Sequence, residues 1–284
     1  MSKDVFNRLL IRVLSVSAYI LYCVFYRTKP CKYFQLNVGY FDNTQGIFSK
    51  MKIDELIPKK WRLSQRFDDG EFEPESFPVF VKPEWGQNAA GIVRADSMPE
   101  LVDIREQNKG SEIRYMIQQA AVEKREFEIF AIASKQSSPD ALTVTEACNE
   151  TGSYPINSIY NSATTYRELT EELSDLQKQN LWSHLSELGF FRIARMSARA
   201  DSLQDLCEGR FHIIEINLFV PLPIDLLDPR YGSAEIVRRV LRYMRSLAVA
   251  TRNRDTSQKT RPVFTKIMTY NRKSPLINRF RASI

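Results

Sequence analysis

The order of apolar and polar positions predicts a chain in which short strands alternate with helices. Short apolar runs bounded by Gly, Pro or polar clusters are typical of strands. Such runs occur at residues 78–95, 114–119, 126–133, 141–147, 190–200 and 211–217. The first run is interrupted by a loop of small residues and therefore predicts a hairpin. Apolar residues at helical spacing predict helices at 170–189 and 234–250, so the predicted fold class is α+β.

End signals indicate one more helix and fix the start of another. Ser97 followed by Glu100 has the capping-box pattern, in which the two residues satisfy each other's free backbone N–H groups. Gly110 is typical of the position just past the end of that helix. Thr170 is, in the same way, the expected N-cap of the helix that runs to Gly189.

Three segments are expected along the chain. An acidic stretch punctuated by Gly and Pro at residues 68–77 marks a boundary. Residues 1–75 are expected to hold an N-terminal helix and a short preceding region, in which residues 32–41 are interpreted as extended. Residues 76–250 form the main domain, and a basic tail covers the remaining positions, 251–284.

An uncharged apolar stretch lies near the N-terminus, at residues 13–26. A membrane-spanning helix needs about 20 apolar residues, and no small-residue cleavage site follows the stretch. A helix packed on the body of the protein is the favoured interpretation. The alternative is a helix on a membrane surface, flanked by Arg8, Arg12, Arg27 and Lys29.

The composition excludes several classes of protein. The chain has 284 residues, of which 43% are hydrophobic and 26% charged, so collagen-like, disulfide-framework and disordered proteins are excluded. Its four cysteines have no Cys-x-x-Cys spacing and it contains two histidines, so neither a zinc site nor a disulfide framework is indicated. A cytoplasmic location is the simplest expectation.

Charge is distributed unevenly. Residues 1–35 carry six Lys or Arg against one acid, and residues 238–284 carry thirteen against one, whereas the part between them is acidic. Basic ends predict contact with a phosphate-rich surface. An anionic membrane surface is the expected partner, nucleic acid is not expected, and a solvated tail is the alternative.

Two oxygen-bearing side chains end the apolar run at 211–217. Side chains alternate between the faces of a strand, so Glu215 and Asn217 share one face. A carboxylate and an amide oxygen together suit a hard divalent cation such as Mg²⁺. The alternative is a structural ion pair or the ordinary polarity of an edge strand.

A lysine and a loop of small residues form a second candidate site. Lys82 ends an apolar run just before the loop at residues 86–91. Backbone N–H groups in such a loop can approach phosphate oxygens, and the lysine adds a positive charge. The spacing is neither that of a P-loop nor that of a dinucleotide-binding turn.

A third candidate is the polar connector that begins at Gln118. An extended connector after a strand can offer backbone groups to the edge of an adenine ring, and a carboxylate a few residues later can accept from ribose hydroxyls. The alternative is a plain strand–turn–strand with solvated charges.

The order of these parts resembles the ATP-grasp superfamily and, within it, the D-alanine–D-alanine ligase-like branch. The matching motifs are PVFVKP, GQNAAG, REFEI, GFFRIA and IIEIN, and the resemblance covers roughly residues 76–230. It implies an ATP-grasp fold, with two α+β subdomains that hold ATP between antiparallel sheets. It also implies an ATP- and Mg²⁺-dependent ligase that joins the carboxylate and the amine of small molecules or peptides through an acyl phosphate.

The resemblance also implies individual roles. The residues implied for ATP binding are Lys82, Gly86, Gln87, Asn88, Gln118, Gln119, Ala121 and Glu126, with Glu123 as a second candidate for the ribose. Arg192 is implied near the transferred phosphoryl group. Glu215 and Asn217 are implied as the Mg²⁺ ligands.

The sequence departs from the family pattern in its N-terminal region and in its metal-binding motif. The N-terminal Rossmann-like domain of the family is expected to be missing or much reduced, since about 75 residues precede the strand that ends in Lys82. The metal-binding Asp of the family, two residues after the arginine, corresponds to Ala194, and Asp201 would replace it only with a different strand pairing. No upstream phosphate-binding lysine matches well, and Lys60 is the candidate.

Alternative functions follow from these departures. They are an ATP-grasp kinase and a non-catalytic protein that binds ATP or docks on a membrane. Arg195 and Arg199 share a strand face, where they would either anchor an acidic substrate or pair with acidic side chains of the protein.

Overall fold

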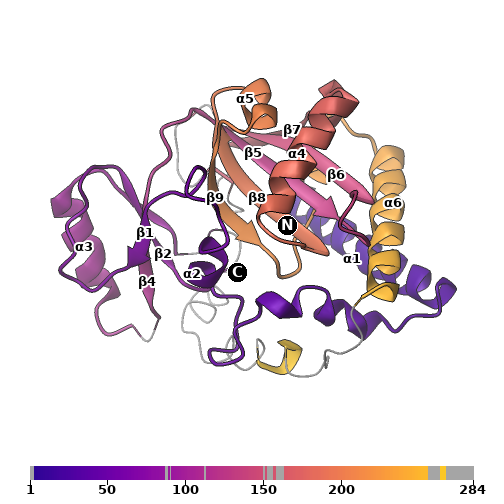
Figure 1. Ribbon diagram of the computed structural model, residues 1–284, viewed down its shortest axis with the longest axis horizontal. Coiled ribbons are helices and arrows are strands. Elements are labelled where there is room, and N and C mark those ends of the chain that lie inside the picture. The colour runs from indigo at the N-terminus through magenta and orange to yellow at the C-terminus, as the bar shows by residue number, and fades with distance from the viewer. Residues whose placement is uncertain are drawn as a thin grey trace.

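The computed structural model describes residues 3–86, 89, 91–111, 113–149, 151, 156–157, 163–254 and 263–266, with side chains from residue 9 onwards. These residues form an α+β fold built on two antiparallel sheets, a small one and a large one (Figure 1). The predicted fold class is confirmed.

The small sheet has four strands and is covered by one helix. Its strands are β1 (Gln65–Phe67), β2 (Val79–Pro83), β3 (Val93–Ala95) and β4 (Tyr115–Gln119), in the order β1-β4-β2-β3. The predicted hairpin is confirmed, because Val79 pairs with Ala95. Helix α3 (Met98–Asn108) starts after Ser97, as expected, and packs Leu101 and Ile104 on the sheet. The predicted capping box is wrong, because the Ser97 side chain makes no capping hydrogen bond and the Glu100 carboxylate accepts from the backbone N–H of Asp96 instead. Strand β1 pairs with β4 of this sheet. The segment boundary expected near residue 75 therefore falls between two strands of one sheet.

The large sheet has five strands. They are β5 (Arg125–Ile132), β6 (Ala141–Asn149), β7 (Thr164–Glu168), β8 (Ile193–Ala200) and β9 (His212–Asn217), in the order β7-β6-β5-β8-β9. Strand β7 lies in a stretch whose polar sequence gave no strand signal. Antiparallel pairing with β6, in which Thr145 lies opposite Glu168, holds this segment as a strand. The local sequence does not indicate that pairing.

Helices cover both faces of the large sheet. Helices α2 (Lys50–Asp54), α4 (Asp175–Glu187) and α5 (Leu203–Glu208) lie on one face, where Ile129 and Met196 of the sheet contribute to the core. Helices α1 (Lys3–Phe25) and α6 (Ser233–Arg252) cover the other face, where Phe130 and Ile132 point. Ile129 and Phe130 thus point to opposite covered faces, so this part of β5 is apolar at consecutive positions.

The long helix of the middle region starts later than expected. Ser174, not Thr170, is the N-cap of α4: its side chain accepts from the backbone N–H of Gln177, and the Gln177 side chain completes the capping box. Thr170 opens the short 3₁₀ turn η3 (Thr170–Glu172), and its hydroxyl accepts from the backbone N–H of Val144 at 2.8 Å. The Thr170 side chain is therefore already engaged by the neighbouring strand.

The segment at residues 32–41 is not extended. It forms two 3₁₀ turns, η1 (Pro30–Gln35) and η2 (Val38–Tyr40). Between them the buried side chain of Asn37 donates to the carbonyls of Ile193 and Leu218. These contacts with distant strands hold the segment in a compact form that the local sequence pattern does not indicate. A third short turn, η4 (Ile224–Leu227), follows β9.

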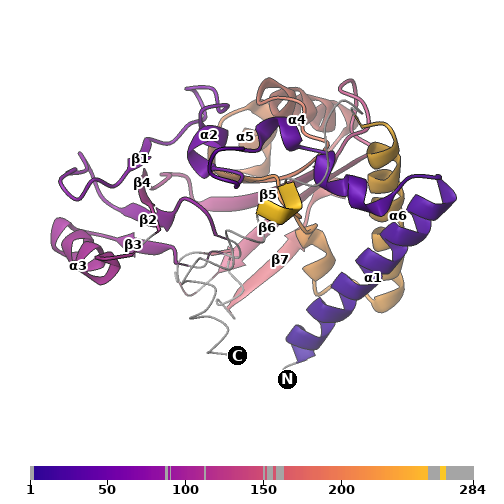
Figure 2. The ribbon, with the colours of Figure 1, turned by 90° about the horizontal axis from the view of Figure 1, so that it is seen from below.

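The first and last helices lie side by side (Figure 2). The hydroxyls of Tyr19 in α1 and Thr251 in α6 are 2.9 Å apart and buried. The expected packing of the N-terminal helix on the body is thereby confirmed. Within the described ranges, no helix combines the length and the apolar character needed to cross a membrane.

Candidate functional site

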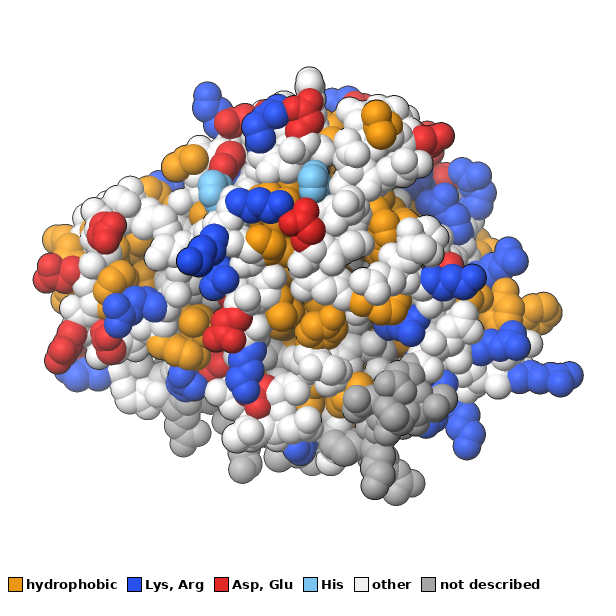
Figure 3. All heavy atoms as spheres, in the orientation of Figure 1, with side chains coloured by type: hydrophobic (Ala, Val, Ile, Leu, Met, Phe, Trp, Pro, Cys, Tyr) orange, Lys and Arg blue, Asp and Glu red, His pale blue; other side chains and the backbone are white. Residues whose placement is uncertain are grey.

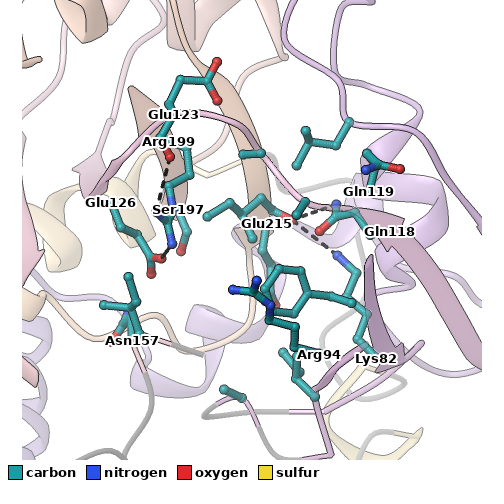
Figure 4. A pocket seen from close by; sticks show the side chains of 18 of the residues that line it. Lys82, Arg94, Gln118, Gln119, Glu123, Glu126, Asn157, Ser197, Arg199 and Glu215 are labelled. Carbon is teal, nitrogen blue, oxygen red and sulfur yellow. Dashed lines mark hydrogen bonds and ion pairs between the residues drawn. The ribbon is translucent and has the colours of Figure 1, made fainter. Parts of the chain in front are cut away.

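A cavity of about 420 Å³ lies between the two sheets. Its walls come from β2 and β4 on one side, from β8 and β9 on the other, and from the connector that joins β4 to β5. Figure 4 shows Lys82, Gln118 and Glu215 gathered at one side of it, and Glu126, Arg199 and Asn157 at the other. The predicted site residues that line this cavity are Lys82, Gly86, Gln118, Gln119, Ala121, Glu126, Glu215 and Asn217.

Lys82 is a buried cation at the end of β2. Its ammonium donates to the carbonyl of Ile214 in β9 at 3.3 Å, and the Gln118 amide donates to the same oxygen at 3.2 Å (Figure 4). One carbonyl of the large sheet thus holds two side chains of the small sheet. Burial, and then the charge of Lys50, lower the pKa of Lys82 to about 7.

A second lysine enters the cavity from α2. Lys50 Nζ lies 3.5 Å from a carboxylate oxygen of Glu215. Lys60, the candidate from the sequence, lies elsewhere: it pairs with Glu187 and its side chain is 55% exposed. The N-cap Ser49 is the signal that could have identified Lys50, because it starts a helix at that residue.

Glu215 and Asn217 face the cavity from β9, as predicted. A register shift between Ser197 and Ala198 lets Ile213 pack in the core while Glu215 faces the cavity. Burial raises the pKa of Glu215, but Lys50, Lys82 and Arg195 outweigh it and hold that pKa below its usual value. Glu215 is therefore a carboxylate at neutral pH.

The two oxygen donors on β9 fit one Mg²⁺ ion. A carboxylate and an amide oxygen suit this cation, which usually completes its shell with phosphate oxygens and water. The Asn217 amide oxygen already accepts from the backbone N–H of Phe219 at 3.0 Å and keeps a second lone pair. In the described part of the chain, no cluster of three or more Asp, Glu, His or Cys side chains could hold a metal.

Strand β8 brings Arg195, not Arg192, into the cavity. Arg195 pairs with Asn217 and Ser197 pairs with Glu215, and both β8 residues line the cavity. Arg192 precedes the strand, and its guanidinium donates to the carbonyls of Ser134 and Asn253, outside the cavity.

Arg195 and Ser197 of β8 therefore face the cavity, whereas Arg192 and Ala194 do not line it. Ala194 lies on the opposite face of β8, in the core beneath α4. Asp201 does not line the cavity either, and its carboxylate accepts from the backbone N–H of Lys124. The local sequence does not distinguish the two registers, because the same spacing occurs twice. Arg192 is followed two residues later by Ala194, and Arg195 by Ser197.

The floor of the cavity carries a buried ion-pair cluster. Glu128 Oε2 lies 3.0 Å from Arg195 Nε, and its other oxygen accepts from the Ser197 hydroxyl at 2.5 Å. Glu126 Oε2 lies 3.3 Å from Arg199 Nη2. Burial raises the pKa of Glu126 to about 7, although Arg199 opposes the shift. Arg195 and Arg199 thus pair with acidic side chains of the protein, the second of the two interpretations left open by the sequence.

Both ribose candidates lie at the same side of the cavity. Glu123 lines it together with Glu126, and a Glu123 oxygen lies 2.6 Å from Nδ1 of His212. Gln119, the last residue of β4, and Ala121 of the connector that follows also line the wall. The stretch from Gln118 to Glu126 is therefore one continuous edge of the site.

The loop after β2 is described in part. Gly86 and Ala89 line the cavity, and Ala89 has a positive φ of 59°, which is uncommon outside glycine. Gln87 and Asn88, also predicted to bind phosphate, lie outside the described residues.

Solved structures of ligases resemble the fold at low sequence identity. An L-amino acid ligase from Bacillus licheniformis matches at 18% identity with a TM-score of 0.42, over 61% of this chain and 40% of that one. A D-alanine–D-alanine ligase from Bacillus anthracis matches at 13% identity with a TM-score of 0.48, over 78% of this chain and 69% of that one. The ATP-grasp ligase PsnB, solved with Mg and ADP, matches at 12% identity with a TM-score of 0.43, over 69% and 58%.

These solved structures include the ligase branch that the sequence motifs resemble. The match to the L-amino acid ligase spans less than half of that protein. No family model matches the sequence, and no curated protein matches it either.

Proposed function

We propose that this protein is an ATP- and Mg²⁺-dependent ligase that joins a carboxylate to an amine through an acyl phosphate. One observation carries the proposal: Lys50, Lys82 and Arg195 converge on Glu215 and Asn217 inside one cavity between two antiparallel sheets. Three cations beside two hard oxygen donors suit a triphosphate with a divalent metal, because they neutralise its charge on several sides.

ATP would lie along the cavity from the connector to β9. The backbone and side chains from Gln118 to Ala121 would bind the adenine. Glu126 or Glu123 would accept hydrogen bonds from the ribose hydroxyls. The triphosphate would then extend toward Lys82, Lys50 and Glu215. In this placement Arg195 takes the role that the sequence motif gave to Arg192, since only Arg195 faces the metal-binding pair.

The reaction needs charge neutralisation more than it needs an acid or a base. A substrate carboxylate oxygen attacks the γ-phosphorus of ATP, the bond from that phosphorus to the bridging oxygen breaks, and ADP leaves. Lys50, Lys82 and Arg195 stabilise the negative charge on the phosphoryl oxygens during transfer. Mg²⁺ bound by Glu215 and Asn217 would supply further neutralisation of the phosphates.

An amine then attacks the carbonyl carbon of the acyl phosphate. The carbon–oxygen bond to phosphate breaks, inorganic phosphate leaves, and the nitrogen gives a proton to that phosphate as the amide forms. The ion pair with the buried carboxylate of Glu128 holds the Arg195 guanidinium in position beside the reacting groups. That pairing fixes the guanidinium before substrate arrives, which lowers the cost of reorganisation.

A second function, binding of ATP without turnover, is favoured by one observation. Ser197 stands where a third metal-binding carboxylate is expected, and its hydroxyl is engaged with Glu128. A site with two protein oxygens holds metal less firmly than one with three, and a protein that only senses ATP would tolerate this.

Product analysis separates these functions. The protein is incubated with ATP, Mg²⁺ and a panel of amino acids and short peptides, and ADP and new amides are followed by mass spectrometry. ADP release that requires both an acid and an amine supports the ligase. A stable phosphorylated product indicates a kinase, and ATP binding without any product indicates the second function. Failure to bind ATP contradicts all three.

A further inference from the structure

The outward face of α1 is apolar and exposed to solvent. Its residues are Leu9, Leu10, Val13, Val16, Ile20, Leu21, Val24 and Phe25, which are 44% to 75% exposed. The opposite face is apolar as well: Ile11, Ala18, Tyr19 and Cys23 are buried against the protein, together with residues of α6. A helix that packs on a protein body normally turns a polar face to water. Helix α1 instead has a second apolar face that the protein itself does not bury.

The side chains around this face are cationic. Arg12, Arg27 and Lys29 are exposed on α1 and directly after it. The neighbouring helix α6 adds Arg242 and Arg245, both exposed, and Arg245 donates to the hydroxyl of Tyr26 at 3.0 Å. Figure 3 shows hydrophobic side chains flanked by Lys and Arg at the right-hand end of the molecule, where α1 ends beside α6.

Acidic residues are absent from this part of the sequence. None occurs between Asp4 and Asp42, and none occurs in α6 after Glu235, whose carboxylate pairs with Arg238 and Arg239. From Leu9 onward in α1 and after Glu235 in α6, all charged side chains are therefore cationic. A contiguous exposed apolar surface of this kind marks an interaction site.

We propose that α1 docks the protein on an anionic lipid bilayer. The helix lies in the plane of the membrane with its outward face at the boundary between headgroups and acyl chains, while its inner face stays packed on α6. The arginines around it meet lipid phosphates and carboxylates. Phe25, at the end of the helix, is 75% exposed and adds an aromatic ring to this apolar face, as is typical of interfacial helices.

Two features favour a bilayer over a second copy of this chain. In a symmetric dimer the same patch faces itself, so the rims that contain Arg12 and Arg27 would approach each other with like charge. An anionic bilayer satisfies the apolar face and the cationic rim at once. Docking also leaves the cavity accessible, because α1 and α6 lie at the end of the molecule opposite α3 and the small sheet (Figure 1).

Vesicle binding of the full-length protein tests the proposal. Sedimentation is measured with vesicles of phosphatidylcholine alone and of phosphatidylcholine with phosphatidylserine. The variant Leu21→Gln/Val24→Gln removes two apolar side chains that are 66% and 68% exposed, so folding should not change. Leu176→Gln on α4 is the matched control, because Leu176 is equally exposed (66%) on another surface.

We expect wild type and Leu176→Gln to bind the anionic vesicles equally. The partition coefficient of the double variant on these vesicles should be lower by roughly tenfold or more. The reason is that two large apolar side chains are no longer transferred from water into the bilayer. Both proteins keep the basic C-terminal tail, so equal binding of the double variant would assign the binding to that tail and overturn the proposal. A wild-type protein that ignores these vesicles, or one that forms dimers which the double variant abolishes, would overturn it as well.

Discussion

Ser197 of β8 lies directly opposite Glu215 of β9, and the two side chains face the same cavity. This pair determines how many carboxylate ligands the site can offer to a metal. With a carboxylate on each strand, the ion would be coordinated from both β8 and β9. With a serine on β8, whose hydroxyl donates to Glu128, Glu215 is the one carboxylate of this cross-strand pair. In the proposed site, a metal would therefore rely on Glu215, Asn217 and the phosphates of the nucleotide.

The Glu215→Gln variant should lose the stabilisation that Mg²⁺ and ATP give together. The neutral amide keeps the shape of the side chain but removes the charge that attracts the cation. The thermal shift produced by Mg·ATP should fall to the value seen with ATP in the presence of EDTA, and turnover should fall on the order of a hundredfold. Glu106→Gln, on the exposed side of α3, is the control. An unchanged Mg²⁺ response in Glu215→Gln would remove the metal assignment.

Lys50 and Lys60 provide a matched pair of variants for the phosphate site. Lys50→Met should weaken ATP binding by roughly 10- to 100-fold, because a charged hydrogen bond to phosphate is lost. Lys60→Met should leave affinity unchanged, since Lys60 pairs with Glu187 at the surface. Isothermal titration calorimetry measures both. Equal losses, or a loss confined to Lys60→Met, would contradict the placement of the triphosphate.

Proton uptake should accompany nucleotide binding. In the free protein, burial and the charge of Lys50 lower the pKa of Lys82 to about 7, so at pH 8 most of the side chain is neutral. A bound phosphate favours the ammonium form and raises this pKa. ATP binding at pH 8 should therefore take up close to one proton, and affinity should fall as the pH rises above 7.

Calorimetry at pH 8 in buffers of different ionisation enthalpy measures the uptake. Lys82→Met should bind ATP more weakly and with no uptake at this site, whereas Lys60→Met should behave as the wild type. The same proton count in Lys82→Met and wild type would show that another group titrates.

Arg195 and Arg192 offer the sharpest test of the register of β8. Arg195→Lys should keep the ion pair with Glu128 in part but lower turnover by roughly a hundredfold, because a lysine cannot present the same fork of donors. Arg192→Lys should leave turnover close to wild type. Thermal unfolding of both variants checks that the fold is intact. Loss of activity in Arg192→Lys alone would return the catalytic role to the position that the motif indicates.

The sequence by itself determined the main strands and the residues that end them. Alternation within a strand is a local property, so the shared face of Glu215 and Asn217 and the position of Lys82 before a small-residue loop could be read from a few neighbouring residues. The hairpin at β2 and β3 and the helix after Ser97 were likewise predictable from short-range signals. The apolar stretch near the N-terminus was also visible there.

Tertiary structure decided which similar residues share the site. Arg192 and Arg195 look alike in sequence, but pairing with β9 turns Arg195 toward Glu215 and leaves Arg192 outside. Lys50 enters the cavity only because α2 packs beside β9. Thr170 failed as a helix cap because β6 uses its hydroxyl. In each case the deciding partner lies far away in the chain, and a long-range contact of this kind leaves no mark on the local spacing of residues.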